Sequence, residues 1–235
     1  MSVDTVINEM AGAAASGETG LTLPEEVELR RVDGRLTLMA DGMELAEDFR
    51  EMLPRLRPDR LGRELLVKAV RVRGVEEIRV FDATAGLGED SMLLAAAGFS
   101  VTMCEGDPVI AALLGDGLRR AVDDPELSGI VGRMSLVEGD SIEILPSLTE
   151  APDVVYLDPM FPARTKSAAV KKKFQLLHRL ESPCADEASL MDAALAARPR
   201  KIVVKRPIKA PALAGVRPSH SISGKAVRYD VIVPA

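Results

Sequence analysis

The segment Asp158-Pro159-Met160-Phe161 combines residue types that can hold a flat amine for reaction. It follows the apolar run 154–157, which we expect to be a strand that ends in a turn. The Asp158 carboxylate and the next backbone carbonyl can accept hydrogen bonds from an exocyclic NH2 group, and Phe161 can stack on its ring. The lone pair of such an amine is delocalised, so positioning and electrostatics must supply most of the catalysis. We therefore predict that Asp158, Pro159 and Phe161 are catalytic; an ordinary Asp-Pro turn is the structural alternative.

A glycine-containing loop lies earlier in the chain, between an expected strand and an expected helix. Gly86 and Gly88 would let the backbone approach a ligand and leave helix N–H groups pointing at it. The dinucleotide fingerprint is incomplete, because Ser91 stands where its third glycine would be. Glu89 and Asp90 would also repel a pyrophosphate, unless they only complement the helix dipole. S-adenosylmethionine has an amine, a sulfonium and no phosphate, so this cofactor suits the loop better.

Two further acidic positions follow the next two expected strands. Glu105 lies 19 residues after Gly86, where an acid can accept both ribose hydroxyls of a nucleoside cofactor. Asp140 could accept the adenine amino group, although Asp140 or Ser141 could equally be a helix N-cap. Ligands of open α/β sheets bind beyond the carboxyl ends of the strands. The sequence therefore predicts a nucleoside cofactor at that edge.

The elements that must position these residues alternate between strands and helices. From Ile78 onward, short apolar runs are separated by helical patterns, which is typical of a parallel sheet covered on both faces. Gly98 is suited to end the first of these helices and Pro108 to begin the second. The tail reads as two strands around Ser223-Gly224-Lys225. We predict an α/β fold with a mostly parallel sheet and a C-terminal antiparallel hairpin.

The N-terminal third has a different pattern. Asp33-Gly34 between alternating runs predicts a hairpin, and from Glu44 to Val72 the pattern turns helical, with breaks near Pro54 and Pro58. We predict a small hairpin and helix extension before the main domain. The expected divisions are a flexible leader at 1–20, an extension at 21–75 and the main domain at 76–235.

Charge is distributed unevenly over the 235 residues. Residues 1–159 hold 15 Lys and Arg against 31 Asp and Glu, and residues 160–235 hold 15 against 5. The net charges of −16 and +10 indicate a polyanion partner for one face, unless the basic block is only a solvated helix. The predicted RNA-binding residues are Arg164, Lys166, Lys171, Lys172, Lys173, Lys205 and Arg206.

Several function classes do not fit the composition. Cys104 and Cys184 are the two cysteines and are far apart, and there are two histidines, so we expect no disulfide framework and no zinc site. No apolar run is long enough for a membrane span. The first residues contain Asp4 and Glu9 and no early Lys or Arg, unlike a secretory signal, so we expect a cytoplasmic protein.

Three stretches resemble the RsmJ-type methyltransferases, which methylate the N2 amine of a guanine in small-subunit (16S) ribosomal RNA. They are "VFDATAGLGEDSMLLAAAGFSVTMCEGDPVIAALLGDGL", "DVVYLDPMFPARTKSAAVKK" and "VVKRPIKAPALAGV", and the resemblance covers about residues 44 to 233. It implies a class I methyltransferase sheet of seven strands and ribosomal RNA or the small subunit as partner. The cofactor contacts that it implies are Glu89, Asp90, Glu105, Gly106, Asp140, Ser141 and Asp158.

The residues alone leave other activities open. The segment at Asp158 would equally serve adenine N6 or a protein glutamine amide, so the guanine assignment depends on the resemblance. An NAD-dependent oxidoreductase is disfavoured by the incomplete glycine fingerprint and by the lack of a His or Lys placed for proton transfer. A non-catalytic RNA-binding assembly factor is disfavoured by the intact Asp158 and glycine loop.

Overall fold

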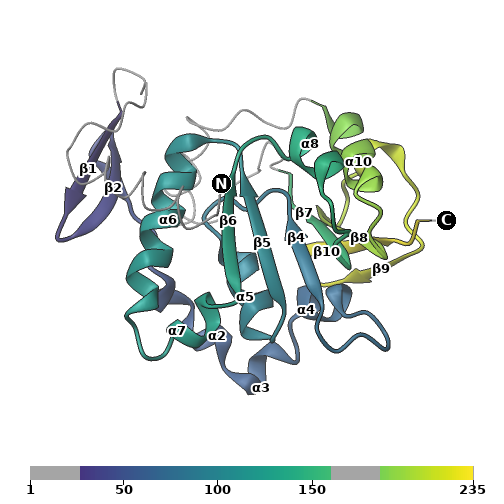
Figure 1. Ribbon diagram of the computed structural model, residues 1–235, viewed down its shortest axis with the longest axis horizontal. Helices are drawn as coiled ribbons and strands as arrows, with labels where there is room; N and C mark the ends of the chain where they lie inside the picture. The colour runs from purple at the N-terminus through teal and green to yellow at the C-terminus, as the bar shows by residue number, and fades with distance from the viewer. Residues whose placement is uncertain (1–26, 160–185, 235) are drawn as a thin grey trace.

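Seven strands form one mixed sheet in the computed structural model, which describes residues 27–159 and 186–234 (Figure 1). Their order across the sheet is β6-β5-β4-β7-β8-β10-β9. The first five strands are parallel, and β10 runs antiparallel to both β8 and β9. This confirms the predicted fold class. The bounds are β4 Arg79–Asp82, β5 Ser100–Glu105, β6 Met134–Glu138, β7 Val154–Leu157, β8 Lys201–Pro207, β9 His220–Ser223 and β10 Val227–Ile232.

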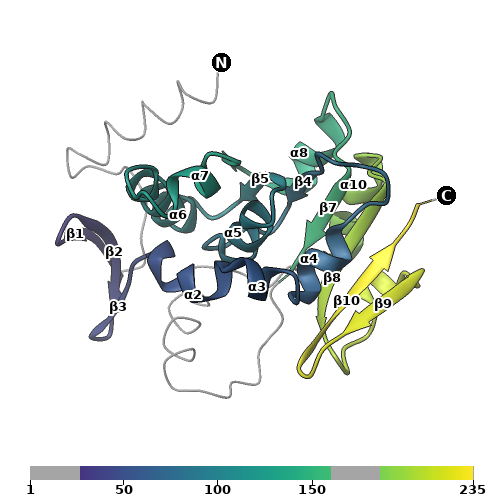
Figure 2. The same cartoon turned by 90° about the horizontal axis from the view of Figure 1, so that it is seen from below.

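Helices cover both faces of this sheet (Figure 2). Successive strand residues point to opposite faces, so Val80 packs in one hydrophobic cluster and Phe81 in another. The first face carries α4 (Leu65–Val70), α5 (Glu89–Ala96) and α6 (Pro108–Val122). The second face carries α8 (Ser141–Ile144), η2 (Leu145–Ser147) and α10 (Glu187–Ala196). As expected, Gly98 follows α5 with a positive φ of 95°, and Pro108 is the first residue of α6.

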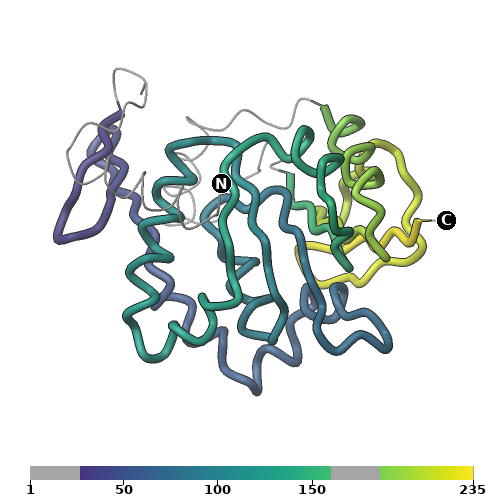
Figure 3. The backbone as a smooth tube through the Cα atoms, in the orientation of Figure 1, coloured from purple at the N-terminus to yellow at the C-terminus, as the bar shows by residue number. Residues whose placement is uncertain are grey.

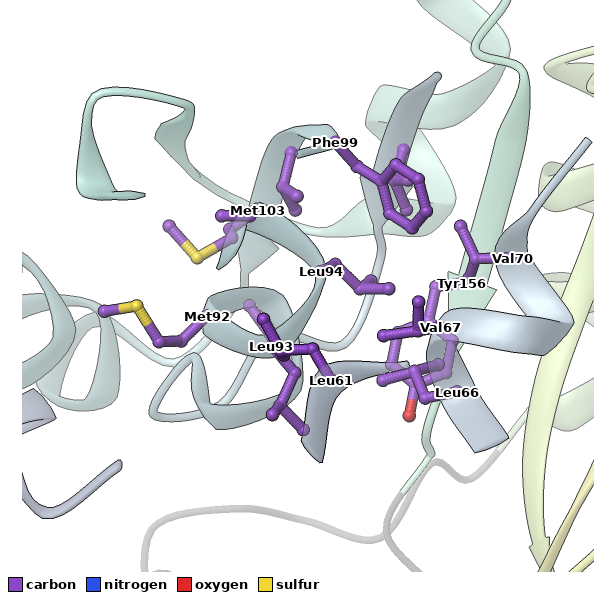
Figure 4. Close-up of a cluster of buried hydrophobic side chains, with 14 of the residues drawn as sticks. Leu61, Leu66, Val67, Val70, Met92, Leu93, Leu94, Phe99, Met103 and Tyr156 are labelled. Carbon is purple, nitrogen blue, oxygen red and sulfur yellow. The ribbon is translucent and has the colours of Figure 1, made fainter. Parts of the chain in front are cut away.

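The first hydrophobic cluster reaches the edge of the sheet where the predicted site lies (Figure 4). Leu66 and Val67 of α4 lie beside Tyr156 from β7, and Leu93 of α5 belongs to the same cluster. Tyr156 is 1% exposed, yet its hydroxyl has a polar partner described below. The core therefore fixes the direction of a side chain that belongs to the site.

A separate three-stranded sheet precedes the main sheet. It contains β1 (Glu28–Val32), β2 (Arg35–Ala40) and β3 (Met43–Leu45), all antiparallel. The predicted Asp33-Gly34 turn is confirmed, with φ values of 49° and 78°. The expected helical pattern from Glu44 is wrong for its first residues. A second Asp-Gly pair at 41–42, with φ values of 50° and 66°, turns the chain back and makes 43–45 a strand.

Four short helical segments connect the two sheets, as the prolines predicted. They are η1 (Phe49–Met52), α2 (Leu53–Leu56), α3 (Pro58–Leu61) and α4. Further short helical segments are α7 (Ser128–Val131) and η3 (Leu213–Gly215), and Figure 3 traces the backbone that connects these elements. The predicted leader at 1–20 and the predicted basic residues between 164 and 173 lie outside the described residues, and the proposed domain limits stay predictions.

Candidate active site

The carboxyl ends of β4, β5, β6 and β7 meet at one edge of the sheet, which we call the carboxyl edge. Asp82 at the end of β4 is in register with Met103 of β5 and with Tyr156 of β7. Glu105 at the end of β5 is in register with Glu138 of β6. The loops that carry the predicted site residues begin directly after the carboxyl ends of these strands. The structure therefore brings all of the predicted acidic positions to one edge.

The two glycines of the loop after β4 have different surroundings. Both have positive φ, 54° at Gly86 and 77° at Gly88, which favours glycine. A Cβ atom at Gly88 would lie 2.8 Å from Leu114 Cδ1, so this glycine allows α6 to pack closely. A Cβ atom at Gly86 would have no described heavy atom within 4 Å outside its chain neighbours. Gly86 is therefore the glycine beside which a ligand would find room.

Glu105 joins this loop to the end of β5. Its Oε2 accepts a hydrogen bond from Gly86 N at 2.8 Å, and its Oε1 accepts one from Asp107 N at 2.8 Å. Burial raises the pKa of Glu105, because the charged form loses water contacts that the backbone N–H groups replace only in part. Each carboxylate oxygen can accept a further bond, so Glu105 is placed to accept ribose hydroxyls beside Gly86.

Asp140 and Ser141 follow β6 and begin α8. Asp140 caps this helix, because its Oδ1 accepts a hydrogen bond from Ile142 N at 2.8 Å. This is the N-cap alternative that the sequence left open. The cap uses one oxygen of Asp140, whose residue is exposed, while Ser141 is buried. Gly106 lies opposite, and a Cβ atom there would be 3.5 Å from the Gly139 carbonyl oxygen.

Asp158 belongs to a cluster of charged side chains at the carboxyl edge. Lys205, on β8, donates from Nζ to Asp158 Oδ2 at 2.7 Å and to Asp90 Oδ2 at 2.6 Å. The Tyr156 hydroxyl donates to the same Asp90 oxygen at 2.6 Å. The backbone N–H of Asp158 donates to Thr84 Oγ1 at 2.6 Å. We call Asp90, Tyr156, Asp158 and Lys205 the lysine cluster.

Burial and charge act in opposite directions on this cluster. Burial opposes ionisation of Asp90, but the Lys205 ammonium outweighs it and lowers the pKa of Asp90 below its usual value. Burial raises the pKa of Asp158 despite the same ammonium. Burial alone would lower the pKa of Lys205, whereas Asp90 and Asp158 raise it. One lysine charge is thus shared between two carboxylates, and the Tyr156 hydroxyl adds a second donor to Asp90.

Asp82 lies beneath the cluster and is 1% exposed. Its Oδ2 accepts a hydrogen bond from Ser91 Oγ at 2.6 Å, and its Oδ1 accepts one from Thr84 N at 3.1 Å. Burial raises its pKa to about 7, and Asp90 and Asp158 add to the effect. Asp82 therefore holds the start of the glycine loop in place and carries a proton over part of the neutral range.

The remaining predicted residues are distributed differently. Pro159 is buried and Glu89 is exposed in the first turn of α5. The other predicted residues between 160 and 185 lie outside the described residues: Phe161, Arg164, Lys166, Lys171, Lys172 and Lys173.

The predicted RNA contact at Arg206 does not fit the structure. Arg206 is 1% exposed, and its guanidinium donates to the Pro211 carbonyl at 2.9 Å and to Glu187 at 3.2 Å. Successive residues of β8 point to opposite faces of the sheet. Arg206 is therefore buried on one face, and Lys205 joins the lysine cluster on the other. Neither cation belongs to a free basic face.

Lys205 stays a predicted RNA contact, and the structure adds contacts to Asp90 and Asp158 that sequence reasoning missed. The sequence nevertheless contained a signal. Leu157 of β7 is in register with Val204 of β8, so the next residues, Asp158 and Lys205, are neighbours at the ends of adjacent strands. Recognising this requires the strand order, which periodicity along one chain does not give.

Metal-binding groups and membrane spans are both absent from the described part of the chain. Over 27–159 and 186–234, no group of three or more His, Cys, Asp or Glu side chains is arranged to hold a metal ion. Within the same ranges, no helix has the length and apolar character needed to span a membrane.

Comparisons with known proteins agree with this geometry. A family described as putative SAM-dependent methyltransferase matches residues 19–234. Ribosomal RNA small subunit methyltransferase J of Thioalkalivibrio sulfidiphilus is 49% identical over 172 residues, which are 72% of this chain and 68% of that protein. The protein of the same name from Pseudomonas fluorescens is 46% identical over 169 residues, 72% of this chain and 65% of that protein.

A solved structure extends the match to nearly the whole fold. A SAM-dependent methyltransferase from Neisseria gonorrhoeae is 34% identical, with a TM-score of 0.75, and the match covers 94% of this chain and 91% of that one. The curated matches span about two thirds of those relatives' length. The chain therefore belongs to the SAM-dependent methyltransferase family that includes proteins named ribosomal RNA small subunit methyltransferase J.

Proposed function

We propose that this protein methylates the exocyclic N2 amine of a guanine in small-subunit (16S) ribosomal RNA. The observation that carries the proposal is Asp158 at the carboxyl end of β7, held on its backbone by Thr84 and on Oδ2 by Lys205. The names of the relatives supply the RNA class. A ribosomal RNA substrate also supports a cytoplasmic location.

S-adenosylmethionine, when bound, supplies a methyl group on a positively charged sulfur. The residues present fit this cofactor. The space beside Gly86 would let the cofactor lie close to the backbone of the glycine loop. The buried Glu105 carboxylate can accept hydrogen bonds from the ribose hydroxyls. Asp140 keeps one oxygen beyond its cap bond for the adenine amine. We also assign Glu89, Asp90, Gly106 and Ser141 to the surroundings of the cofactor, as the family resemblance implies.

Asp158 has the role of orienting the guanine amine. Its Oδ2 is engaged by Lys205, and Oδ1 makes no hydrogen bond to a residue that the structure describes. Oδ1 can therefore accept one N–H of the amine, and the backbone carbonyl that follows can accept the other. These two bonds would fix the ring so that the nitrogen lone pair, which is perpendicular to the ring plane, faces the methyl donor. The cofactor would supply the methyl carbon as its carbon–sulfur bond broke, and the surplus proton on the alkylated nitrogen would pass to solvent water.

The side chains at this position are accessible. Asp158 is 33% exposed, Lys205 25% and Asp90 19%, so a base can reach Asp158 from solvent. Phe161 and the cations between 164 and 173 are proposed to stack on that base and to contact phosphates. This part of the proposal depends on the sequence.

The direct test is methyl transfer to RNA. Purified protein and cofactor with a labelled methyl group are incubated with naked 16S RNA and, separately, with assembled small subunits, and the RNA is digested to nucleosides. The expected product is N2-methylguanosine, with loss of the signal in Asp158→Ala. Methylated adenine or labelled protein would instead support the other amine substrates. Cofactor binding without any methyl transfer would support an assembly factor.

A further inference from the structure

Lys205 is the one cation that directly contacts Asp158 in the described part of the chain. Its ammonium lies between Asp158 Oδ2 at 2.7 Å and Asp90 Oδ2 at 2.6 Å. Asp158 follows β7 and Asp90 lies in the first turn of α5, after the glycine loop, so Lys205 connects the amine-binding segment to the cofactor loop. Neither the contacts expected for the cofactor nor those expected for the guanine base require a lysine at this position.

The neighbours of Asp158 are mostly acidic. Asp90 from α5 and Asp82 from β4 act on one another and on Asp158 through their charges. The hydroxyls of Tyr156 from β7 and Tyr229 from β10 also lie within electrostatic range. Arg55 of α2 acts on Asp90, and Glu64 beside α4 acts on Tyr229. Without the lysine, like charges and burial would both favour a protonated Asp158.

A protonated Asp158 would be unsuited to the proposed role. A neutral carboxyl group has one O–H donor and reduced acceptor strength, whereas the guanine N2 amine brings two N–H donors. Its hydrogen bond to the amine would therefore be weaker, and it would no longer stabilise the positive charge that develops on nitrogen. The charge state of Asp158 thus decides how well the amine is held.

We propose that Lys205 is a positioning residue that keeps Asp158 ionised and fixes its Oδ2, so that Oδ1 faces the substrate amine. This inference rests on the proposed function for its catalytic consequence. Asp90 and Tyr156 complete the arrangement, since the two hydrogen bonds to Asp90 Oδ2 hold that acid, and through it the lysine, in one place. Asp90 also competes with Asp158 for the lysine charge.

A lysine on the same strand provides the matched control. Lys201, at the opposite end of β8, donates from Nζ to the carbonyl oxygens of Ala69 and Arg71, both at 2.6 Å. Its bonds hold the segment after α4 and involve no carboxylate. Lys201→Met therefore removes a half-buried lysine from β8 without changing the charge around Asp158.

The first experiment measures single-turnover methyl transfer as a function of pH, with saturating cofactor and RNA. In Lys205→Met we expect the acidic limb of the profile to move to higher pH by about 1 or more, because an adjacent opposite charge changes the pKa of a carboxyl group by that amount. At a pH below both midpoints, a limb displaced by about 1 in pH lowers the rate about tenfold. Lys205→Arg should restore the position of the limb, and Lys201→Met should leave it unchanged.

Asp90→Asn moves the profile in the other direction. It removes the competing carboxylate, so the lysine charge acts on Asp158 alone and the acidic limb should move to lower pH. This variant also tests the inference if Lys205→Met does not fold. An equal loss of rate at every pH in Lys205→Met, or unmoved limbs in both variants, would overturn the positioning role.

A second readout needs no catalysis. Carbon-13 NMR of aspartate-labelled protein follows the titration of Asp158 directly, with Asp158→Asn to assign its signal. A higher titration midpoint in Lys205→Met, with no methylation of RNA by the wild-type protein, would refute the proposed function and leave the electrostatic role standing. Normal methylation with an unchanged midpoint would refute the role of Lys205 alone.

Discussion

Glu105 combines two tasks at the carboxyl edge, because the carboxylate that holds Gly86 is also the proposed acceptor of the ribose hydroxyls. Hydrogen bonds to a charged group contribute about 1.5–3 kcal/mol each. We expect Glu105→Ala to lower the affinity for S-adenosylmethionine at least about tenfold, measured by calorimetry. Glu143→Ala, at an exposed position of α8, is the control and should leave the affinity unchanged. Equal affinities in both variants would remove Glu105 from the cofactor site.

Asp82 should make stability depend on pH. Its pKa is about 7 in the folded protein and about 3.8 when unfolded, so the folded state binds the extra proton between these values. Stability should therefore fall as pH rises from about 4 to about 7, by up to about 4 kcal/mol. Asp82→Asn mimics the protonated form and should become the more stable protein as pH rises. Urea unfolding at several pH values checks this, and a constant difference between the two proteins would contradict it.

Some site residues could be predicted from the sequence and others could not, and each outcome has a physical cause. Acids at strand ends, such as Glu105 and Asp158, were predictable because the ends of parallel strands converge whatever the helices do. Arg206 was misassigned, and the carboxylate contacts of Lys205 were missed, because a count of charges treats every cation as exposed. Only the strand register shows that one faces two carboxylates and that the other is buried against Glu187.

Helix α6 attaches the small N-terminal sheet through one buried acid. Asp116 is 1% exposed and accepts hydrogen bonds from Arg31 at 3.0 Å, Arg119 at 2.7 Å, Arg120 at 2.8 Å and Leu36 N at 3.1 Å. Around it, apolar residues of β2 pack on α6. The attachment therefore combines a hydrophobic contact with a carboxylate that has four donors.

Asp116→Asn should weaken this attachment. Removing one partner of a buried ion pair costs about 3–5 kcal/mol, and the partial exposure of the arginines should keep the loss near the lower value. Urea unfolding should show this loss, and hydrogen exchange should accelerate first in β1–β3. Asp123→Asn, exposed at the end of α6, should change stability by less than about 0.5 kcal/mol. Unchanged exchange in β1–β3 would show that the hydrophobic contact alone is sufficient.

Strands were easier to predict where the residues of the turn itself, such as an Asp-Gly pair, determine the backbone conformation. The Asp-Gly pair at 33–34 identified its hairpin, and the same pair at 41–42 could have identified β3. The helical pattern that begins beside it masked the signal. The antiparallel tail was predictable because Gly224 separates two alternating runs, whereas the position of β10 between β8 and β9 depends on pairing across the sheet.

At the scale of the whole molecule, the basic C-terminal part should make RNA binding sensitive to salt. Each single-strand phosphate that is neutralised contributes about −0.7 to the slope of log affinity against log salt. Replacing Lys171, Lys172 and Lys173 together by Ala should make the slope less negative by about 2. Arg133→Ala is the control, because Arg133 precedes β6 at the edge of the sheet opposite the site. Filter binding at several salt concentrations checks this, and identical slopes would show that the lysines only solubilise the protein.

The place of β10 in the sheet also has a consequence for folding during synthesis. Among the described strands, β10 comes last in the sequence, yet it pairs with β8 on one side and with β9 on the other. Until residues 227–232 have emerged from the translating ribosome, β8 keeps an unpaired edge and β9 has no partner in the sheet. Lys205 lies on that incomplete strand, opposite Tyr229. The lysine cluster of the nascent chain should therefore be completed only when β10 inserts beside β8.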